Sequence, residues 1–153
     1  MEYIYHAMTK ILYAGRISPI KDVNTLKKAV KILGLKLLIK NSYAYRDVAK
    51  VLREGDIIVV PTLSKSLDKV FLEGLACGVP TIGTDVGYPF MKDKFPELIY
   101  NAGDDADLAR KITWLIDHPQ KTKEITLKAR KFVKDNYDLD QLMTKIYDQF
   151  SLA

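Results

Sequence analysis

Cysteine, histidine and long apolar runs are scarce in this sequence, and each scarcity excludes a class of protein. Cys77 is the single cysteine among 153 residues, which excludes an internal disulfide framework and suits a reducing compartment. His118 has no second histidine, cysteine pair or carboxylate cluster around it, so we expect no metal site. No apolar run approaches the length of a membrane span and the first residues lack a signal-peptide pattern, so we expect a soluble, cytoplasmic protein.

What is present is enough for one domain with a mildly basic surface. A chain of 153 residues, 48% of them hydrophobic, can bury a single core. The net charge of +5 suits an anionic ligand or peripheral contact with the inner membrane surface, whereas a solvated, lysine-rich surface is the alternative. The basic residues form no stripe interleaved with aromatics, so nucleic acid is not expected as a partner.

The chain alternates between short apolar, β-branched runs and segments with apolar residues three or four positions apart, a pattern of strands and helices. The expected strands are 10–15, 35–40, 57–60, 81–85 and 97–101. The expected helices are one between Asp22 or Asn24 and Gly34, then 46–54, 70–77, 105–117, 121–137 and 139–150. This alternation predicts an open parallel α/β sheet flanked by helices.

Two loops at the carboxyl ends of expected strands are candidates for a ligand site. Gly15 ends the first strand, with Arg16 and Lys21 beside the turn, and the polar loop 62–69 follows the third strand. Open α/β sheets bind ligands at this edge, and cationic side chains beside a helix N-terminus favour an anion. The alternative is that both cations are simply solvated.

Two motifs resemble a known enzyme family. The run PTLSKSLDKVFLEGLACGVPTIGTDVG is similar to the donor-binding half of the family-4 retaining glycosyltransferases of GT-B fold. The run YAGRISPIKDV resembles the family's G-R-x-S-x-x-K-G element, which contacts the nucleotide diphosphate. The resemblance implies that residues 1–153 form a single Rossmann-like GT-B half. Residues 1–7 have no clear period and could be a leader or a short extra strand, whereas the spacing of apolar residues indicates a C-terminal amphipathic helix over 138–153.

The reaction implied by the resemblance is transfer of a hexose from a nucleotide diphosphate sugar, with retention and without a metal or other cofactor. Arg16 and Lys21 would hold the diphosphate and stabilise the leaving nucleotide, and Glu73 would bind the ribose, which makes these three the candidate catalytic residues. The implied nucleotide-sugar-binding residues are Gly15, Arg16, Lys21, Thr62, Lys65, Lys69 and Glu73. Because the acceptor-binding half is not in this sequence, catalysis would require a partner chain.

The sequence departs from the family pattern in the loop before Glu73. The family carries two glutamates separated by seven residues; Glu73 matches the second, but Lys65 stands at the first, and Ser66 and Asp68 replace glycines. An ammonium group cannot accept hydrogen bonds from sugar hydroxyls. Asp68 is a good helix N-cap, yet its charge would repel a diphosphate, which Lys65 and Lys69 could offset. The loop is therefore still suited to an anion, but it lacks the carboxylate that would contact the hydroxyls of the donor sugar.

Two other functions stay open at this point. One is a nucleotide or nucleotide-sugar binding module without transfer, which Lys65 favours. The other is an interaction protein that keeps the fold without binding nucleotide. Whatever the function, we expect the apolar face of helix 139–150 to be covered by its own sheet, in a homodimer or by a separate acceptor-domain subunit. One strand and helix unit of the family pattern is also missing before helix 46–54, where Tyr43 and Tyr45 could stack on a base or serve only in packing.

Overall fold

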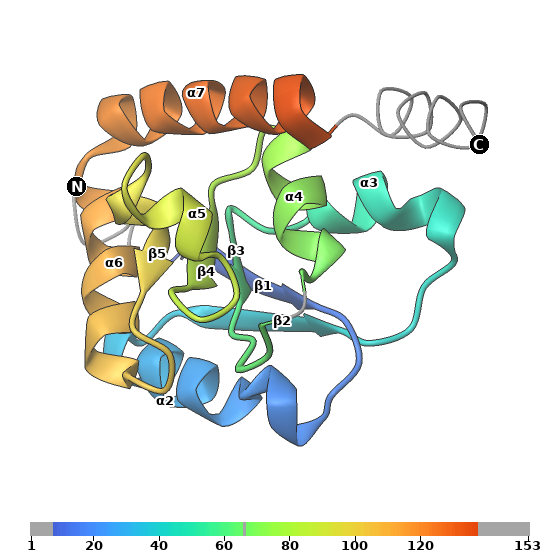
Figure 1. Ribbon diagram of the computed structural model, residues 1–153. Coiled ribbons are helices and arrows are strands. Elements are labelled where there is room, and N and C mark those ends of the chain that lie inside the picture. The colour runs from blue at the N-terminus through green and yellow to red at the C-terminus, as the bar shows by residue number, and fades with distance from the viewer. Residues whose placement is uncertain (1–7, 66, 138–153) are drawn as a thin grey trace.

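The structure of the protein is a computed structural model that describes residues 8–65 and 67–137. Within these residues, parallel strands form a five-stranded sheet in the order β2-β1-β3-β4-β5 (Figure 1). The strands are β1 (Lys10–Ala14), β2 (Lys36–Lys40), β3 (Ile57–Val60), β4 (Thr81–Thr84) and β5 (Ile99–Tyr100). The expected parallel α/β fold is confirmed, and each strand lies within its expected range.

The helices connect the strands and then cover the sheet. They are α2 (Val23–Leu33), α3 (Val48–Leu52), α4 (Lys69–Ala76), α5 (Pro89–Lys92), α6 (Asp105–Asp117) and α7 (Pro119–Tyr137). Three short 3-10 turns precede α2, α3 and β5: η1 (Pro19–Lys21), η2 (Tyr45–Asp47) and η3 (Pro96–Leu98).

Several element boundaries differ from the sequence prediction. The helix expected over 46–54 is shorter, because its first turn is the 3-10 turn η2. The last described helix begins at Pro119 rather than at residue 121, since the fixed φ of proline suits the first position of a helix. The strand expected over 97–101 is reduced to two residues because η3 occupies its beginning.

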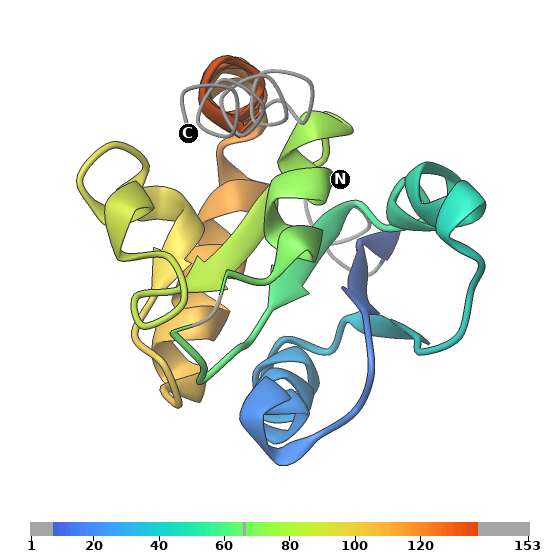
Figure 2. The same cartoon turned by 45° about the vertical axis from the view of Figure 1, so that its right-hand side comes forward.

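The helices lie in two layers. The chain runs from β1 outward to β2, but from β3 outward in the opposite direction to β4 and β5. Right-handed crossovers therefore place α2 on one face of the sheet and α4 on the other. Figures 1 and 2 show α6 beside α2 and α7 across α4, and these two pairs of helices are in contact.

The core is continuous across the sheet. Strands β3 and β4 are buried at every residue, as expected for strands covered on both faces, whereas the edge strand β2 is only partly buried. One hydrophobic cluster runs from β1 and α2 through α4 to α6 and α7. Among the described helices, none combines the length and the apolarity needed to cross a membrane.

Some sequence predictions fall outside the described residues. These are the leader at 1–7, Ser66, and the C-terminal helix 138–153 with its proposed interface at 139–150.

The strand order also locates the edge where a ligand is expected. The chain adds β2 on one side of β1 and adds β4 and β5 on the other side of β3, so the order of strand addition reverses between the parallel neighbours β1 and β3. Loops leaving the carboxyl ends of two such strands diverge to opposite faces of the sheet, which leaves a crevice for ligands. The loops that follow β1 and β3 are the two singled out in the sequence.

Candidate functional site

The loop after β1 brings the two predicted cations to the carboxyl edge of the sheet. Gly15 ends the strand with a φ of 142°, a conformation that side-chain-bearing residues rarely adopt. The hydroxyl of buried Tyr13 donates a hydrogen bond to the carbonyl of Arg16 and ties down the loop. Arg16 is exposed, and Lys21 lies in η1 directly before α2. Asp22 caps α2 as one of the two expected caps, accepting from the Thr25 amide.

The loop after β3 is joined to the loop after β1 by the backbone. The amide of Leu63 donates to the carbonyl of Ile20 over 2.7 Å. Buried Thr62 accepts at its carbonyl from the Thr84 hydroxyl, and at its own hydroxyl from the Ser64 amide. The structure therefore gives Thr62 a role in holding the loop.

Of the other predicted binding residues on this side, Lys65 and Lys69 are both exposed. Lys69 begins α4, so its charge lies at the first turn of that helix.

Asp68 links the two loops through its side chain. One carboxylate oxygen accepts from the Val70 amide over 3.2 Å, which confirms the predicted N-cap of α4. The other oxygen forms an ion pair with the Lys21 ammonium group. Its backbone carbonyl also accepts from the Tyr88 hydroxyl over 3.1 Å. The ion pair is the feature that sequence reasoning missed, because its partners are 47 residues apart and only the fold brings them together.

Glu73 is half-buried on α4 and shares its surroundings with two tyrosines. Burial raises the pKa of the Glu73 carboxyl, the negative charge of Asp68 raises it further, and Lys69 lowers it. Burial and then the charges of Glu73 and Asp68 raise the pKa of Tyr43. The pKa of Tyr13 is raised to about 12 by burial, by Asp68 and by Tyr43. Side chains from β1, from the loops after β2 and β3 and from α4 therefore lie within electrostatic reach of one another.

The two tyrosines that could stack on a base differ in their placement. Tyr43 is partly buried and packs against the core beside this group, whereas Tyr45 is 79% exposed. Tyr43 is therefore held against the core near Glu73, whereas the Tyr45 side chain extends into solvent.

The position of α4 is fixed by very close packing on the sheet. A Cβ atom at Gly74 would lie 2.4 Å from Thr81 Oγ1 and 3.0 Å from Ile58 Cδ1. At the beginning of the helix, Phe71 stacks on Tyr88 with ring centroids 3.9 Å apart. These contacts determine where Asp68 and Glu73 stand relative to the loop after β1.

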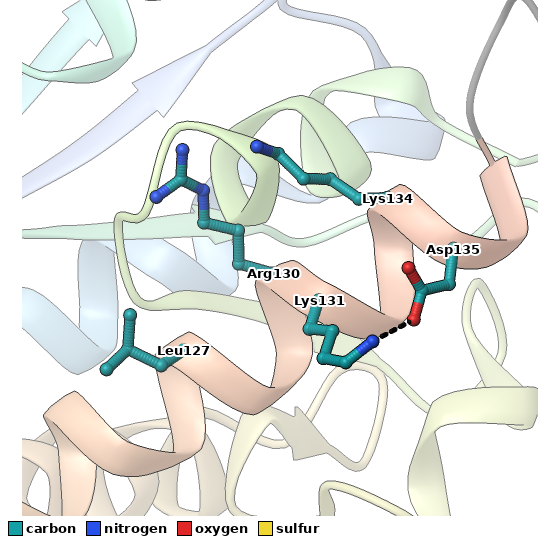
Figure 3. A pocket seen from close by; sticks show the side chains of 5 residues that line it. All are labelled: Leu127, Arg130, Lys131, Lys134 and Asp135. Atoms are coloured by element: carbon teal, nitrogen blue, oxygen red, sulfur yellow. Dashed lines mark hydrogen bonds and ion pairs between the residues drawn. The ribbon is translucent and has the colours of Figure 1, made fainter.

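A shallow depression on α7 lies apart from these loops. It has a volume of about 270 Å³ and is lined by Leu127, Arg130, Lys131, Lys134 and Asp135 (Figure 3). Lys131 and Asp135 point toward one another and pair at 2.6 Å, and Arg130 donates to the carbonyl of Ala76 at the end of α4. The Arg130 hydrogen bond joins α7 to α4, the Lys131–Asp135 pair lies within α7, and none of the predicted site residues lines this depression. In residues 8–65 and 67–137, no three histidine, cysteine or acidic side chains gather in a way that could hold a metal ion.

Comparison with known proteins points to one enzyme family. The family model described as "Glycosyl transferases group 1" matches residues 9–118, which include the sheet and both candidate loops. A sulfoquinovosyl transferase of Arabidopsis thaliana is 30% identical over 115 residues, covering 70% of this chain and 22% of that protein. An uncharacterised glycosyltransferase of Methanocaldococcus jannaschii is 27% identical over 149 residues, covering 80% of this chain and 42% of that protein. The chain thus spans less than half the length of these relatives.

Solved structures show the same fold. Anabaena HepE in complex with UDP superimposes with a TM-score of 0.81 at 16% identity, covering 99% of this chain and 51% of that one. The catalytic domain of a cholesterol-α-glucosyltransferase from Helicobacter pylori gives a TM-score of 0.70 at 17% identity, covering 83% of this chain and 98% of that one. At these identities the likeness concerns the fold, and it confirms a single Rossmann-like half of the GT-B type.

Proposed function

Since this chain belongs to the group 1 glycosyl transferases, we propose that it binds the nucleotide diphosphate sugar donor of a glycosyl transfer reaction. The main support for the proposal is that two loops meet between β1 and β3, where the order of strand addition reverses. One loop brings Arg16 and Lys21, and the other leads into α4 with Glu73. HepE, which has the same fold, was crystallised with UDP and with UDP-glucose.

Each predicted residue has a role in the proposed site. Arg16 and Lys21 hold the diphosphate and stabilise the negative charge that develops on the leaving nucleotide as the glycosidic bond breaks. The Glu73 carboxylate accepts hydrogen bonds from the ribose hydroxyls. Gly15 lets the backbone approach the ligand closely, as its φ of 142° allows. Thr62 holds the neighbouring loop, from which Lys65 and Lys69 add positive charge. In this proposal the charge on the leaving group is met by these cations and not by a metal.

We further propose that the transferred group is a hexose, that its configuration is retained, and that the acceptor binds to a second half supplied by a partner. The matched regions make up less than half of the relatives' own length, which leaves room in those proteins for such a half. The alternative to a separate acceptor-binding partner is a homodimer that forms through residues 139–150. The net charge of +5 is compatible with a cytoplasmic protein that makes peripheral contact with an anionic membrane surface.

A second candidate function is a binding module that recognises the nucleotide without transferring the sugar. Lys65 favours it, because an ammonium group at this position cannot accept hydrogen bonds from sugar hydroxyls. Such a module would bind UDP and UDP-glucose with equal affinity and show no turnover with any partner. The variant Lys65→Glu would then increase the affinity for UDP-glucose relative to that for UDP.

Calorimetric titration with UDP, GDP and their hexose conjugates tests the proposal. We expect micromolar binding of one nucleotide by the wild type and at least tenfold weaker binding by Arg16→Ala, since a charged contact to phosphate is lost. Arg53→Ala is the matched control, because Arg53 is an exposed arginine at the far end of α3. No binding of either nucleotide at millimolar concentration would contradict the proposed function. Equal affinity of the Arg16 variant and the wild type would contradict this location for the phosphates.

A further inference from the structure

The ion pair between Lys21 and Asp68 occupies the charges that the proposed site would use. Lys21 comes from η1 after β1, and Asp68 comes from the loop before α4. Their side chains are only 24% and 16% exposed, so water and salt screen the pair less than a surface ion pair. The attraction between the two groups must therefore be overcome before Lys21 can bind another anion.

The Asp68 carboxylate is held firmly on its side of the pair. One oxygen caps α4 at the Val70 amide, and the residue's carbonyl accepts from Tyr88, whose ring stacks on Phe71. Lys21, in contrast, reaches the pair on a long and flexible side chain. A change of partner therefore involves movement of the lysine more readily than movement of the aspartate.

The geometry of this carboxylate resembles that of a bound anion. It places one oxygen on an ammonium group and the other on a backbone amide at a helix N-terminus, which are the groups that a phosphate would contact. Its charge also reaches the rest of the site, since it contributes to the raised pKa values of Glu73, Tyr43 and Tyr13. A diphosphate entering here would meet both a competitor for Lys21 and a like charge.

We propose that Asp68 is an internal competitor of the ligand phosphates, which sets the affinity of the site for nucleoside diphosphates below the level that its cations would otherwise give. This inference rests on the proposed function. Removal of the Asp68 charge frees Lys21 for phosphate, and it removes the repulsion between Asp68 and the phosphates.

Two variants separate the charge of Asp68 from its capping role. Asparagine and serine are both good N-caps, so Asp68→Asn and Asp68→Ser keep an acceptor for the Val70 amide while they remove the charge. Asp56→Asn is the matched control. Asp56 accepts from the Lys10 amide at the opposite, amino edge of the sheet, so the same change of charge is made away from the site. Thermal unfolding would first establish that all variants are folded.

The variants are then titrated with UDP and with uridine, which lacks phosphate. We expect both Asp68 variants to bind UDP about tenfold more tightly than the wild type, because a like charge a few ångströms from the phosphates is gone. Uridine affinity should stay unchanged, and Asp56→Asn should bind UDP as the wild type does. Lys21→Met should weaken UDP binding more in the Asp68→Asn background than in the wild type, because Lys21 is then free to bind phosphate.

The outcomes distinguish this inference from the proposed function. If the wild type binds UDP and the Asp68 variants bind it equally or more weakly, Asp68 is not a competitor and the inference is overturned, while the proposed function stands. A matching gain in uridine affinity would also overturn it, because the effect would not depend on phosphate charge. If neither the wild type nor either Asp68 variant binds UDP, the proposed function fails and the inference fails with it.

Discussion

Glu73 is a half-buried carboxylate on α4, with Leu72 and Gly74 as its neighbours in the chain. Burial raises its pKa and the nearby charge of Asp68 raises it further, so the ionised form at neutral pH is disfavoured by the fold. Because Glu73 is unfavourable for folding, its presence suggests a role in binding, here the proposed contact with the ribose. The balance between stability and binding can be measured at this one position.

We predict that Glu73→Gln is more stable than the wild type at pH 7, with a melting temperature higher by up to about 2 °C. Because the pKa is higher in the folded state, the stability contributed by Glu73 is fully present below its ordinary value of 4.5 and falls as the pH rises through the folded value. The difference between variant and wild type should therefore vanish at low pH. UDP binding should weaken about tenfold.

Glu124→Gln is the control for this prediction. A hydrogen bond from Lys128 lowers the pKa of Glu124, so its contribution to stability has the opposite sign and is lost as the pH falls. This control should gain no stability at pH 7 and should bind UDP normally. Loss of stability in Glu73→Gln at pH 7 would mean that the carboxylate has a stabilising role in the fold.

Tyr13→Phe tests whether the loop that carries Arg16 is held by the tyrosine hydroxyl. The lost hydrogen bond to the Arg16 carbonyl should lower the free energy of unfolding by about 0.5–1.5 kcal/mol and weaken UDP binding. The pKa of Tyr13 is about 12 in the folded protein, above its ordinary value of 10.0, so its contribution to stability is lost as the pH rises from about 10 to 12. Urea unfolding at pH 7 and pH 11 should show a smaller alkaline loss for the variant. An identical loss of stability between pH 7 and pH 11 in both proteins would contradict the raised pKa of Tyr13.

At the level of residues, whether a contact of the site could be predicted depends on how far apart its two residues lie in the sequence. The sequence correctly indicated that Asp68 caps α4, that α2 ends at Gly34, and that Asp22 or Asn24 caps α2. Each of these features depends on neighbours in the chain. The ion pair of Asp68 with Lys21 does not, because it requires the loops after β1 and β3 to be adjacent.

At the scale of elements, α4 is the helix on which the proposed site depends most. This helix can pack closely on the sheet because residue 74 is glycine, and any side chain there would meet Thr81 and Ile58. Sequence patterns located α4 within one residue because its apolar spacing, its N-cap and the glycine after it agree. They missed α5, because its single turn over Pro89–Lys92 is too short to show a period.

We predict that Gly74→Ala destabilises the protein by about 1–2 kcal/mol, as in other overpacked cores. Alanine is the better helix former, but its Cβ would lie 2.4 Å from Thr81 Oγ1, and Thr81 is a stiff, buried side chain that donates to the Val79 carbonyl. The measurement is urea unfolding. In a double-mutant cycle, Thr81→Ala should be less harmful in the Gly74→Ala background than in the wild type, since it removes the clashing atoms. An unchanged or increased stability of Gly74→Ala would show that α4 is seated more loosely.

At the scale of the whole molecule, the order of the strands decides which loops form the site. Local patterns predict strands and helices, but they contain no information about which strands are neighbours, so the adjacency of β1 and β3 follows only from the fold or from a resemblance to a known family. The continuous core then ties this edge to the distant helices α6 and α7. Ligand binding at the two loops should therefore stabilise the described domain as one unit.

Trp114 can report whether α6 unfolds together with the sheet. It is the single tryptophan and lies in α6, where it stacks on His118. UDP at about 100 times its Kd should add about 2.7 kcal/mol to the stability of the folded state. For a domain of this size, the melting temperature should then rise by roughly 5–10 °C. We expect Trp114 fluorescence and far-UV circular dichroism to report the same shift, and Arg16→Ala to show a smaller one at the same UDP concentration. A shift seen by circular dichroism without one at Trp114 would mean that α6 unfolds independently of the sheet, and that the site stabilises only part of the domain.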